Sequence, residues 1–142
     1  MKLVVDSNIF IGGLDPKDAL HQECLPVVER IVTGEIEALC PVLVLVETTC
    51  AFRRRTTVDL AFNVKEALAR LPSILWLDIN TDVAERACVL GIQTGLRGAD
   101  ALVLQVAEQY GVPLVTMDRE IRDKAPGGIF VLEPREVLAR LS

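Results

Sequence analysis

The chain has 142 residues, 51% of them hydrophobic but only 4% aromatic, and its formal net charge at pH 7 is −5. This length and apolar content predict one domain, spanning residues 1–142, with a core of mostly aliphatic side chains. The negative charge argues against a protein that coats nucleic acid nonspecifically, because such binding needs a basic surface, but it does not exclude an enzyme that meets phosphates through bound cations.

The sequence predicts neither a membrane protein nor a secreted one. No apolar run approaches the ~18 residues of a membrane span, and Asp6 interrupts the first apolar stretch before a signal peptide develops. No two of the four cysteines form a CxxC pair, so we interpret them as buried free thiols of a cytoplasmic protein. Because His21 is the single histidine, a zinc site is not expected, and His21 is interpreted as a surface or loop residue.

The first half of the chain predicts two strands, each followed by helices. The run Leu3-Val4-Val5 leads straight into Asp6, which is typical of a strand buried on both faces. Apolar spacing then predicts a short turn or helix over residues 9–13, a helix over 20–31, a strand over 36–40 and a helix over 42–55. Pro26 lies inside the helix over 20–31, so we expect a kink there or a second helix that begins there.

The second half continues the alternation of helices and strands. The pattern predicts a helix over residues 60–71, strand 74–77, helix 83–90, helix 99–110, strand 114–116, a helical turn over 119–124, strand 129–132 and helix 134–141. Strands that alternate with helices in this way predict an α/β fold, a three-layer sandwich with a five-stranded, mainly parallel sheet.

Three aspartates are expected to meet at one edge of this sheet. Asp6 and Asp118 each end a strand, and Asp100 opens a helix after a glycine-bounded loop. The carboxyl ends of parallel strands and the starts of the neighbouring helices lie on the same side of the sheet, where ligands bind. Glu47 interrupts an otherwise apolar helix face and is a fourth candidate.

Bringing four carboxylates together costs free energy. At an effective dielectric constant of ~20, two carboxylates ~5 Å apart repel each other by ~3 kcal/mol. Either some of them stay protonated, with raised pKa, or a hard cation such as Mg²⁺ or Mn²⁺ neutralises them. Such a cation polarises a phosphoryl oxygen and activates water, which favours phosphodiester hydrolysis. Each acid alone also has a purely structural explanation, as a helix cap, a charge on the helix dipole or an exposed helix residue.

Four short motifs follow one another along the chain. They are VVDSNIFI at residues 4–11, VE at 46–47, LRGADALVL at 96–104 and LVTMD at 114–118. In this order they resemble the PIN domain family, and the length is similar to that of its VapC-type toxins. The resemblance assigns the four acidic positions of the family to Asp6, Glu47, Asp100 and Asp118, and its supporting polar positions to Asn8 and Thr116.

The resemblance implies a five-stranded parallel sheet and a Mg²⁺- or Mn²⁺-dependent endoribonuclease. The four acids would hold the metal and act in catalysis, and Asn8 and Thr116 would orient the carboxylates. It further implies a homodimer, an RNA substrate and a small antitoxin protein whose tail enters the acidic groove. The low aromatic content argues against a base-stacking platform, so the sequence predicts no RNA sequence preference.

Basic residues near the acids suggest where a phosphate binds. Arg97, beside Asp100, is the better candidate for a phosphate contact. Consecutive helix residues point ~100° apart, so Arg53, Arg54 and Arg55 cannot all face one groove. For these three, RNA contact, a solvated helix face and antitoxin contact all stay open.

Two other interpretations compete with a nuclease. One is a PIN-like module that binds an antitoxin or scaffolds a complex without cutting RNA. The other is a phosphoacceptor receiver, in which Asp78 at the end of the third strand would be phosphorylated, but Lys124 is badly placed for the lysine that receivers need. Cleavage of RNA distinguishes the nuclease from both.

Overall fold

Five parallel strands form the central sheet of the structure, a computed structural model that describes all residues from Met1 to Ser142. The strands are β1 (Lys2–Val5), β2 (Glu37–Pro41), β3 (Ile74–Leu77), β4 (Leu114–Val115) and β5 (Val131–Leu132). Their order across the sheet is β3-β2-β1-β4-β5, and every pair of neighbours is parallel. The predicted α/β class with a five-stranded sheet is therefore confirmed, and the sheet is wholly parallel.

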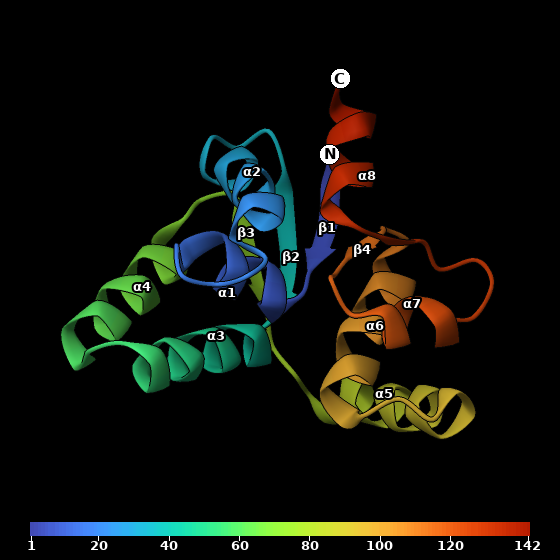
Figure 1. Cartoon of the computed structure of the whole chain (residues 1–142). Coiled ribbons are helices and arrows are strands. Elements are labelled where there is room, and N and C mark those ends of the chain that lie inside the picture. Colours follow the sequence, from blue (N-terminus) through green and yellow to red (C-terminus); the bar gives the residue numbers. More distant parts are fainter.

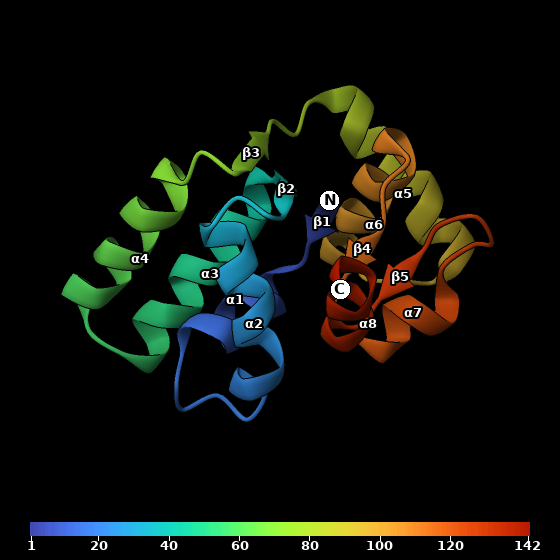
Figure 2. The same cartoon turned by 90° about the horizontal axis from the view of Figure 1, so that it is seen from above.

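Helices cover both faces of this sheet. They are α1 (Ser7–Leu14), α2 (His21–Val32), α3 (Val42–Arg55), α4 (Val58–Arg70), α5 (Thr81–Thr94), α6 (Gly98–Tyr110), α7 (Arg119–Lys124) and α8 (Pro134–Leu141). Figure 2 shows α6, backed by α5, on one face and α1, α2 and α8 on the other, so the three predicted layers are present. Helices α3 and α4 extend as an arm to the left in Figure 1.

The middle strand is the centre of the core. Leu3, Val4 and Val5 of β1 are fully buried and belong to a cluster of 28 buried apolar residues. Because helices pack on both faces of the sheet, apolar side chains are stabilised on both, which explains why β1 is a continuous apolar run rather than an alternating one. This burial fixes the position of Asp6, the next residue.

Helix α2 differs from the sequence prediction at Pro26. Residues 21–32 form one continuous helix with Pro26 inside it, so of the two predicted alternatives, a kink or a second helix, the second helix is wrong. A proline lacks the N–H that an interior helix position donates. Here Cys24, Val27 and Ile31 bury one face of the same helix, and this tertiary packing offsets the missing hydrogen bond.

Two further predictions about single residues need correction. Cys24 and Cys40 are buried free thiols as expected, but Cys50 and Cys88 are exposed, because each lies on the outer face of its helix. His21 does not lie in a loop. It is the first residue of α2, half-buried, with Nδ1 2.9 Å from the carbonyl oxygen of Gly12, and it ties α2 to α1.

No single helix is both long and apolar enough to cross a membrane. Helices α5 and α6 meet the requirement only when they are taken together, by length and composition, and they are bent by 110° relative to each other.

Candidate active site

The topology brings the four predicted acids to one edge of the sheet. Strands β1 and β4 are neighbours, so Asp6 and Asp118, which follow them, lie at the same carboxyl edge. Helix α6 leads into β4 and runs opposite to it, so Asp100, in its first turn, lies at this edge too. Glu47 comes from the helix that directly follows β2. We call these residues the four-acid site.

Asp6 is the most buried of the four acids. Only 6% of its surface is exposed. Its Oδ1 accepts the backbone N–H of Ser7 at 2.8 Å, which caps α1. Its Oδ2 accepts the Thr116 hydroxyl at 2.7 Å and the Asn8 side-chain amide at 3.2 Å. Donors on both oxygens hold this carboxylate in one orientation.

Asn8 and Thr116 connect Asp6 to Asp118. The Asn8 side chain donates to the Thr116 hydroxyl at 3.1 Å and accepts the backbone N–H of Met117 at 3.2 Å. The Thr116 oxygen in turn accepts the backbone N–H of Asp118 at 3.0 Å. Asn8 and Thr116, the two polar residues that the sequence singled out, therefore link Asp6 to Asp118. These two acids are more than a hundred positions apart in the chain.

Ser7 is a site residue that the sequence interpretation missed. Its hydroxyl lies beside the Glu47 carboxylate and favours the charged form of that acid. Burial nevertheless raises the pKa of Glu47, and the charge of Asp100 raises it further. Its position between Asp6 and Asn8 could have marked Ser7 as a site residue in the sequence. Its contact with Glu47 follows only from the packing of α1 against α3.

The charges of the four acids act on one another. Burial raises the pKa of Asp6 to about 6, and the charges of Glu47 and Asp118 add to this rise against the Thr116 and Ser7 hydrogen bonds. Burial also raises the pKa of Asp100 to about 6, together with repulsion from Asp118 and Asp6. Charges affect one another's pKa in this way when the carboxylates lie near each other, here at the carboxyl edge of the sheet.

Arg97 is the basic residue whose charge acts on Asp100. It is exposed, precedes α6 and lowers the pKa of Asp100, while Glu120 raises it. Arg97 acts on Asp100 through its charge and without a hydrogen bond, and its side chain forms no ion pair. Its guanidinium therefore lies near the four-acid site with no partner of its own, and its contact with a phosphate stays a prediction.

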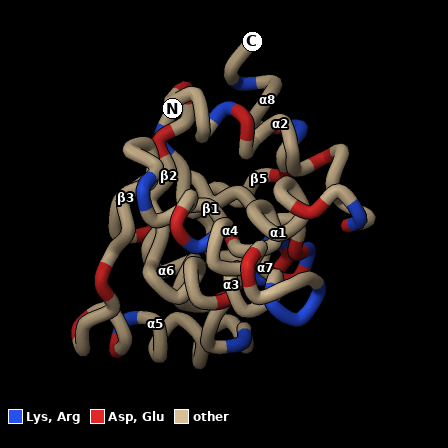
Figure 3. The backbone as a smooth tube through the Cα atoms, turned by 90° about the vertical axis from the view of Figure 1, so that its left-hand side faces the viewer, with Lys and Arg blue, Asp and Glu red and all other residues tan.

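Arg55 has a different, structural partner. It binds Asp15 at 3.1 Å and Asp18 at 2.7 Å, which ties the end of α3 to the segment between α1 and α2. This ion pair agrees with the geometric argument that the three consecutive arginines do not share one direction. Figure 3 shows basic and acidic residues scattered along the backbone, apart from one continuous basic run, the three arginines at the end of α3.

The donor set of the four-acid site fits a hard divalent cation. Four carboxylates with mutual repulsion, and with Arg97 as the one cation that acts on Asp100, suit Mg²⁺ or Mn²⁺ by charge and by ligand type. The side chains are not gathered into a finished coordination shell, because no group of three or more His, Cys, Asp or Glu residues is arranged to hold a metal ion. The structure thus shows the convergence of the acids but not a preformed metal site.

Comparisons with known proteins agree with this architecture. The sequence model of the PIN domain family matches residues 3–126. No curated protein matches the chain.

Several solved structures share the fold at low sequence identity. VapC20 of Mycobacterium tuberculosis, described as a sarcin-ricin loop cleaving toxin, has a TM-score of 0.72 and 18% identity over 90% of this chain and 98% of its own. A toxin–antitoxin complex from Klebsiella pneumoniae has a TM-score of 0.69 and 19% identity over 93% and 97%. VapBC2 of Rickettsia felis, bound to a DNA fragment from its promoter, has a TM-score of 0.69 and 13% identity over 94% and 98%.

Proposed function

The chain belongs to the PIN domain family, whose members are generally nucleases, and on this premise we propose that it is a divalent-metal-dependent endoribonuclease. We further propose that it acts in the cytoplasm, as a homodimer, as the toxin of a toxin–antitoxin pair. The observation that carries the proposal is the approach of Asp6, Glu47, Asp100 and Asp118 to one another: charges within this set raise the pKa of Asp6, Glu47 and Asp100.

In this proposal the four acids hold Mg²⁺ or Mn²⁺. When bound, the ion supplies Lewis-acid chemistry, polarising a phosphoryl oxygen and making water more acidic. Asp6 is buried and held by Thr116, Asn8 and the Ser7 N–H, so its carboxylate is oriented before any ligand arrives. Preorganised ligands of this kind lose little conformational entropy when they bind.

Other residues serve the substrate in this proposal. Arg97 is exposed and without a side-chain partner, and it would attract the phosphate that the negative charge of the acids repels. Ser7 would hold the Glu47 carboxylate through its hydroxyl. RNA is the proposed substrate because a structural neighbour, VapC20, is described as a toxin that cleaves the sarcin-ricin loop.

The test is cleavage of a mixed RNA pool by the purified chain. Wild type should cut with Mg²⁺ or Mn²⁺ and should not cut in EDTA. Asp100→Asn should lower the rate by ~100-fold or more, because it removes a proposed metal ligand. Asp59→Asn is the matched control, since Asp59 also lies in the first turn of a helix but is exposed on α4.

Three results would overturn the proposal. Equal cutting by Asp100→Asn would indicate a contaminating nuclease. Cutting that persists in EDTA would refute the dependence on a metal. RNA binding or antitoxin binding by a wild type that never cuts would instead indicate a binding module.

The antitoxin is tested separately, by producing the chain together with the protein encoded by the neighbouring reading frame. Neighbouring folds come from toxin–antitoxin complexes, which supports a small protein partner. The two proteins should purify as a stoichiometric complex in which RNA cleavage is inhibited. If the neighbour neither binds nor inhibits, the toxin–antitoxin part of the proposal fails while the nuclease part stands.

A further inference from the structure

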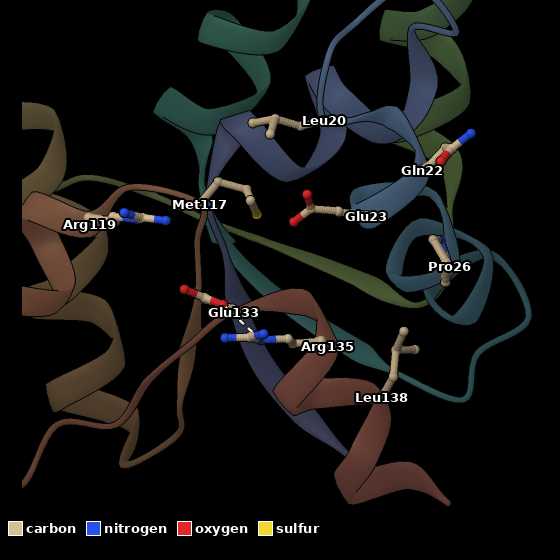
Figure 4. A pocket seen from close by; sticks show the side chains of 9 residues that line it. All are labelled: Leu20, Gln22, Glu23, Pro26, Met117, Arg119, Glu133, Arg135 and Leu138. Atoms are coloured by element: carbon tan, nitrogen blue, oxygen red, sulfur yellow. Dashed lines mark ion pairs between the residues drawn. The ribbon is translucent and has the colours of Figure 1, made fainter.

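A cavity of about 650 Å³ opens next to the four-acid site. Met117 and Arg119, which flank Asp118 in the chain, both line it, and the opposite walls come from α2 and α8 (Figure 4). Asn8 accepts the backbone N–H of Met117, so one residue orients Asp6 and fixes the cavity wall. We call this cavity the Met117 pocket. Through Met117 and Arg119 the pocket adjoins Asp118, one of the four acids.

The apolar walls of the Met117 pocket are held in place by the core. Leu20, Met117 and Leu138 line it and pack against the main apolar cluster of the chain. Enzymes that bind an unstacked base pack it against aromatic or apolar side chains. These three side chains give the pocket apolar surface of that kind.

Two side chains of opposite charge in the pocket, Glu23 and Arg119, form no ion pair. Figure 4 shows the Glu23 carboxylate, from α2, and the Arg119 guanidinium, from α7, on opposite sides of the cavity and directed into it. No ion pair joins them, since Glu133 and Arg135 form the one ion pair among the residues drawn in Figure 4. Arg135, by contrast, is paired with Glu133 at 3.1 Å, and Gln22 points away from the cavity in Figure 4.

This pair of charges matches one base better than the other three. Guanine has two acceptors, O6 and N7, along one edge, and an arginine binds them as a bidentate donor. Along its next edge, guanine has two neighbouring donor groups, N1–H and the N2 amino group, which a carboxylate accepts together. Adenine, cytosine and uracil each offer a carboxylate only one donor group along an edge.

We propose that the Met117 pocket receives a guanine base splayed out of the RNA strand beside the scissile phosphate. Arg119 binds O6 and N7, Glu23 accepts N1–H and the N2 amino group, and the apolar walls pack on the base. The proposal rests on the nuclease function above and makes Glu23 and Arg119 its specificity residues.

The experiment uses two modified bases that each remove one contact. First, the cut sites in a randomised single-stranded RNA are mapped, and wild type should prefer one position with guanine. Short RNAs are then made with guanine, inosine or 7-deazaguanine at that position. Inosine lacks the N2 amino group, and 7-deazaguanine lacks N7. Each should lower kcat/KM of wild type by ~10-fold or more, the usual scale for one lost base contact.

The variants should lose sensitivity to one modified base each. Glu23→Gln should cut the guanine and inosine RNAs at nearly the same rate, while it still discriminates against 7-deazaguanine. Arg119→Ala should show the reverse. Glu29→Gln, exposed on the same helix, and Arg140→Ala, exposed on α8, are the matched controls and should keep both preferences of wild type. A variant that is merely unstable would lose rate on all three RNAs equally.

The results separate this proposal from the function on which it rests. If wild type cuts no RNA, or if Asp100→Asn cuts equally well, the nuclease function fails. Two results would overturn the pocket assignment and leave the nuclease function standing. In the first, wild type cuts RNA but shows no guanine preference. In the second, replacing guanine with inosine lowers kcat/KM of Glu23→Gln as much as it lowers kcat/KM of wild type.

Discussion

Asp6 combines two opposing influences at the residue scale. Three hydrogen-bond donors surround its carboxylate, which favours the charged form, yet burial and neighbouring acids raise its pKa to about 6. Loss of hydration therefore outweighs the hydrogen bonds. Such an acid costs folding free energy when it is ionised, which proteins accept where the charge serves a function.

The first prediction concerns this cost. The folded-state pKa of Asp6 is raised from 3.8 to about 6, so the folded protein keeps a proton that the unfolded chain has already lost. The contribution of Asp6 to stability is therefore most favourable below pH 4 and falls as the pH rises towards 6, by about 3 kcal/mol in total. Asp6→Asn should gain stability relative to wild type over this interval.

The measurement is the free energy of unfolding in urea at pH 4, 5, 6 and 7, without divalent ions. The comparison uses the difference between variant and wild type, because acids outside the four-acid site titrate equally in both. Asp59→Asn, on the exposed surface of α4, should show no such pH-dependent difference. A constant difference between Asp6→Asn and wild type across the four pH values would contradict the prediction.

The second prediction concerns Thr116. Its hydroxyl donates to Asp6 and its oxygen accepts the N–H of Asp118, so Thr116→Val removes both bonds with little change in volume. Loss of a residue that orients metal ligands typically lowers metal affinity or activity ~10–100-fold. Titration of Mn²⁺ by calorimetry and RNA cleavage should both show the loss. Thr33→Val, exposed after α2, is the control, and an equal loss in it would refute the orienting role.

At the element scale, α1 and α2 pack closely through a small residue. A Cβ on Gly13 would lie 2.4 Å from the Val28 side chain and 3.2 Å from the Cys24 carbonyl oxygen. The first contact is too short for real atoms, and the second is to backbone, which cannot turn aside. This approach brings α2, with Glu23 and the Met117 pocket, to its place beside α1.

Gly13→Ala should therefore destabilise the protein by about 1–3 kcal/mol, the usual cost of overpacking a core. A fall in the unfolding midpoint in urea at an unchanged slope would show it. Gly98→Ala is the matched control, because Gly98 is also helical and no atom lies within 4 Å of its added Cβ. An unchanged midpoint for Gly13→Ala would mean that the two helices separate at no cost.

The whole molecule links metal binding to stability. If the four acids hold Mn²⁺ or Mg²⁺, the ion relieves their repulsion only in the folded state, since the unfolded chain does not bring them together. At an ion concentration 100 times the dissociation constant, the stabilisation is about 2.7 kcal/mol. Thermal unfolding of wild type at pH 7 should therefore shift to higher temperature as Mn²⁺ is added.

Asp100→Asn provides the comparison for this prediction. The variant lacks one of the repelling charges and one proposed ligand, so it should be at least as stable as wild type without metal and should respond much less to Mn²⁺. Asp59→Asn should respond as wild type does. Equal shifts for all three proteins would place any metal binding elsewhere in the chain.

The amino-acid pattern alone predicted most of the elements. The continuous run over 3–5, the helical spacing over 99–110 and the Pro-led helix over 134–141 all appear in the structure. These signals are local, because apolar periodicity, caps and prolines act over a few residues. The acids at the strand ends could be named for the same reason, and the PIN resemblance is confirmed by the family match.

Only the tertiary structure decided how distant residues meet. The order of the strands places β1 beside β4, so that Thr116 donates to Asp6 across 110 positions and Ser7 meets Glu47. Packing kept α2 continuous through Pro26 and left Glu23 facing Arg119. The physical reason is that such contacts depend on the free energy of burying the whole core, which no short segment of sequence encodes.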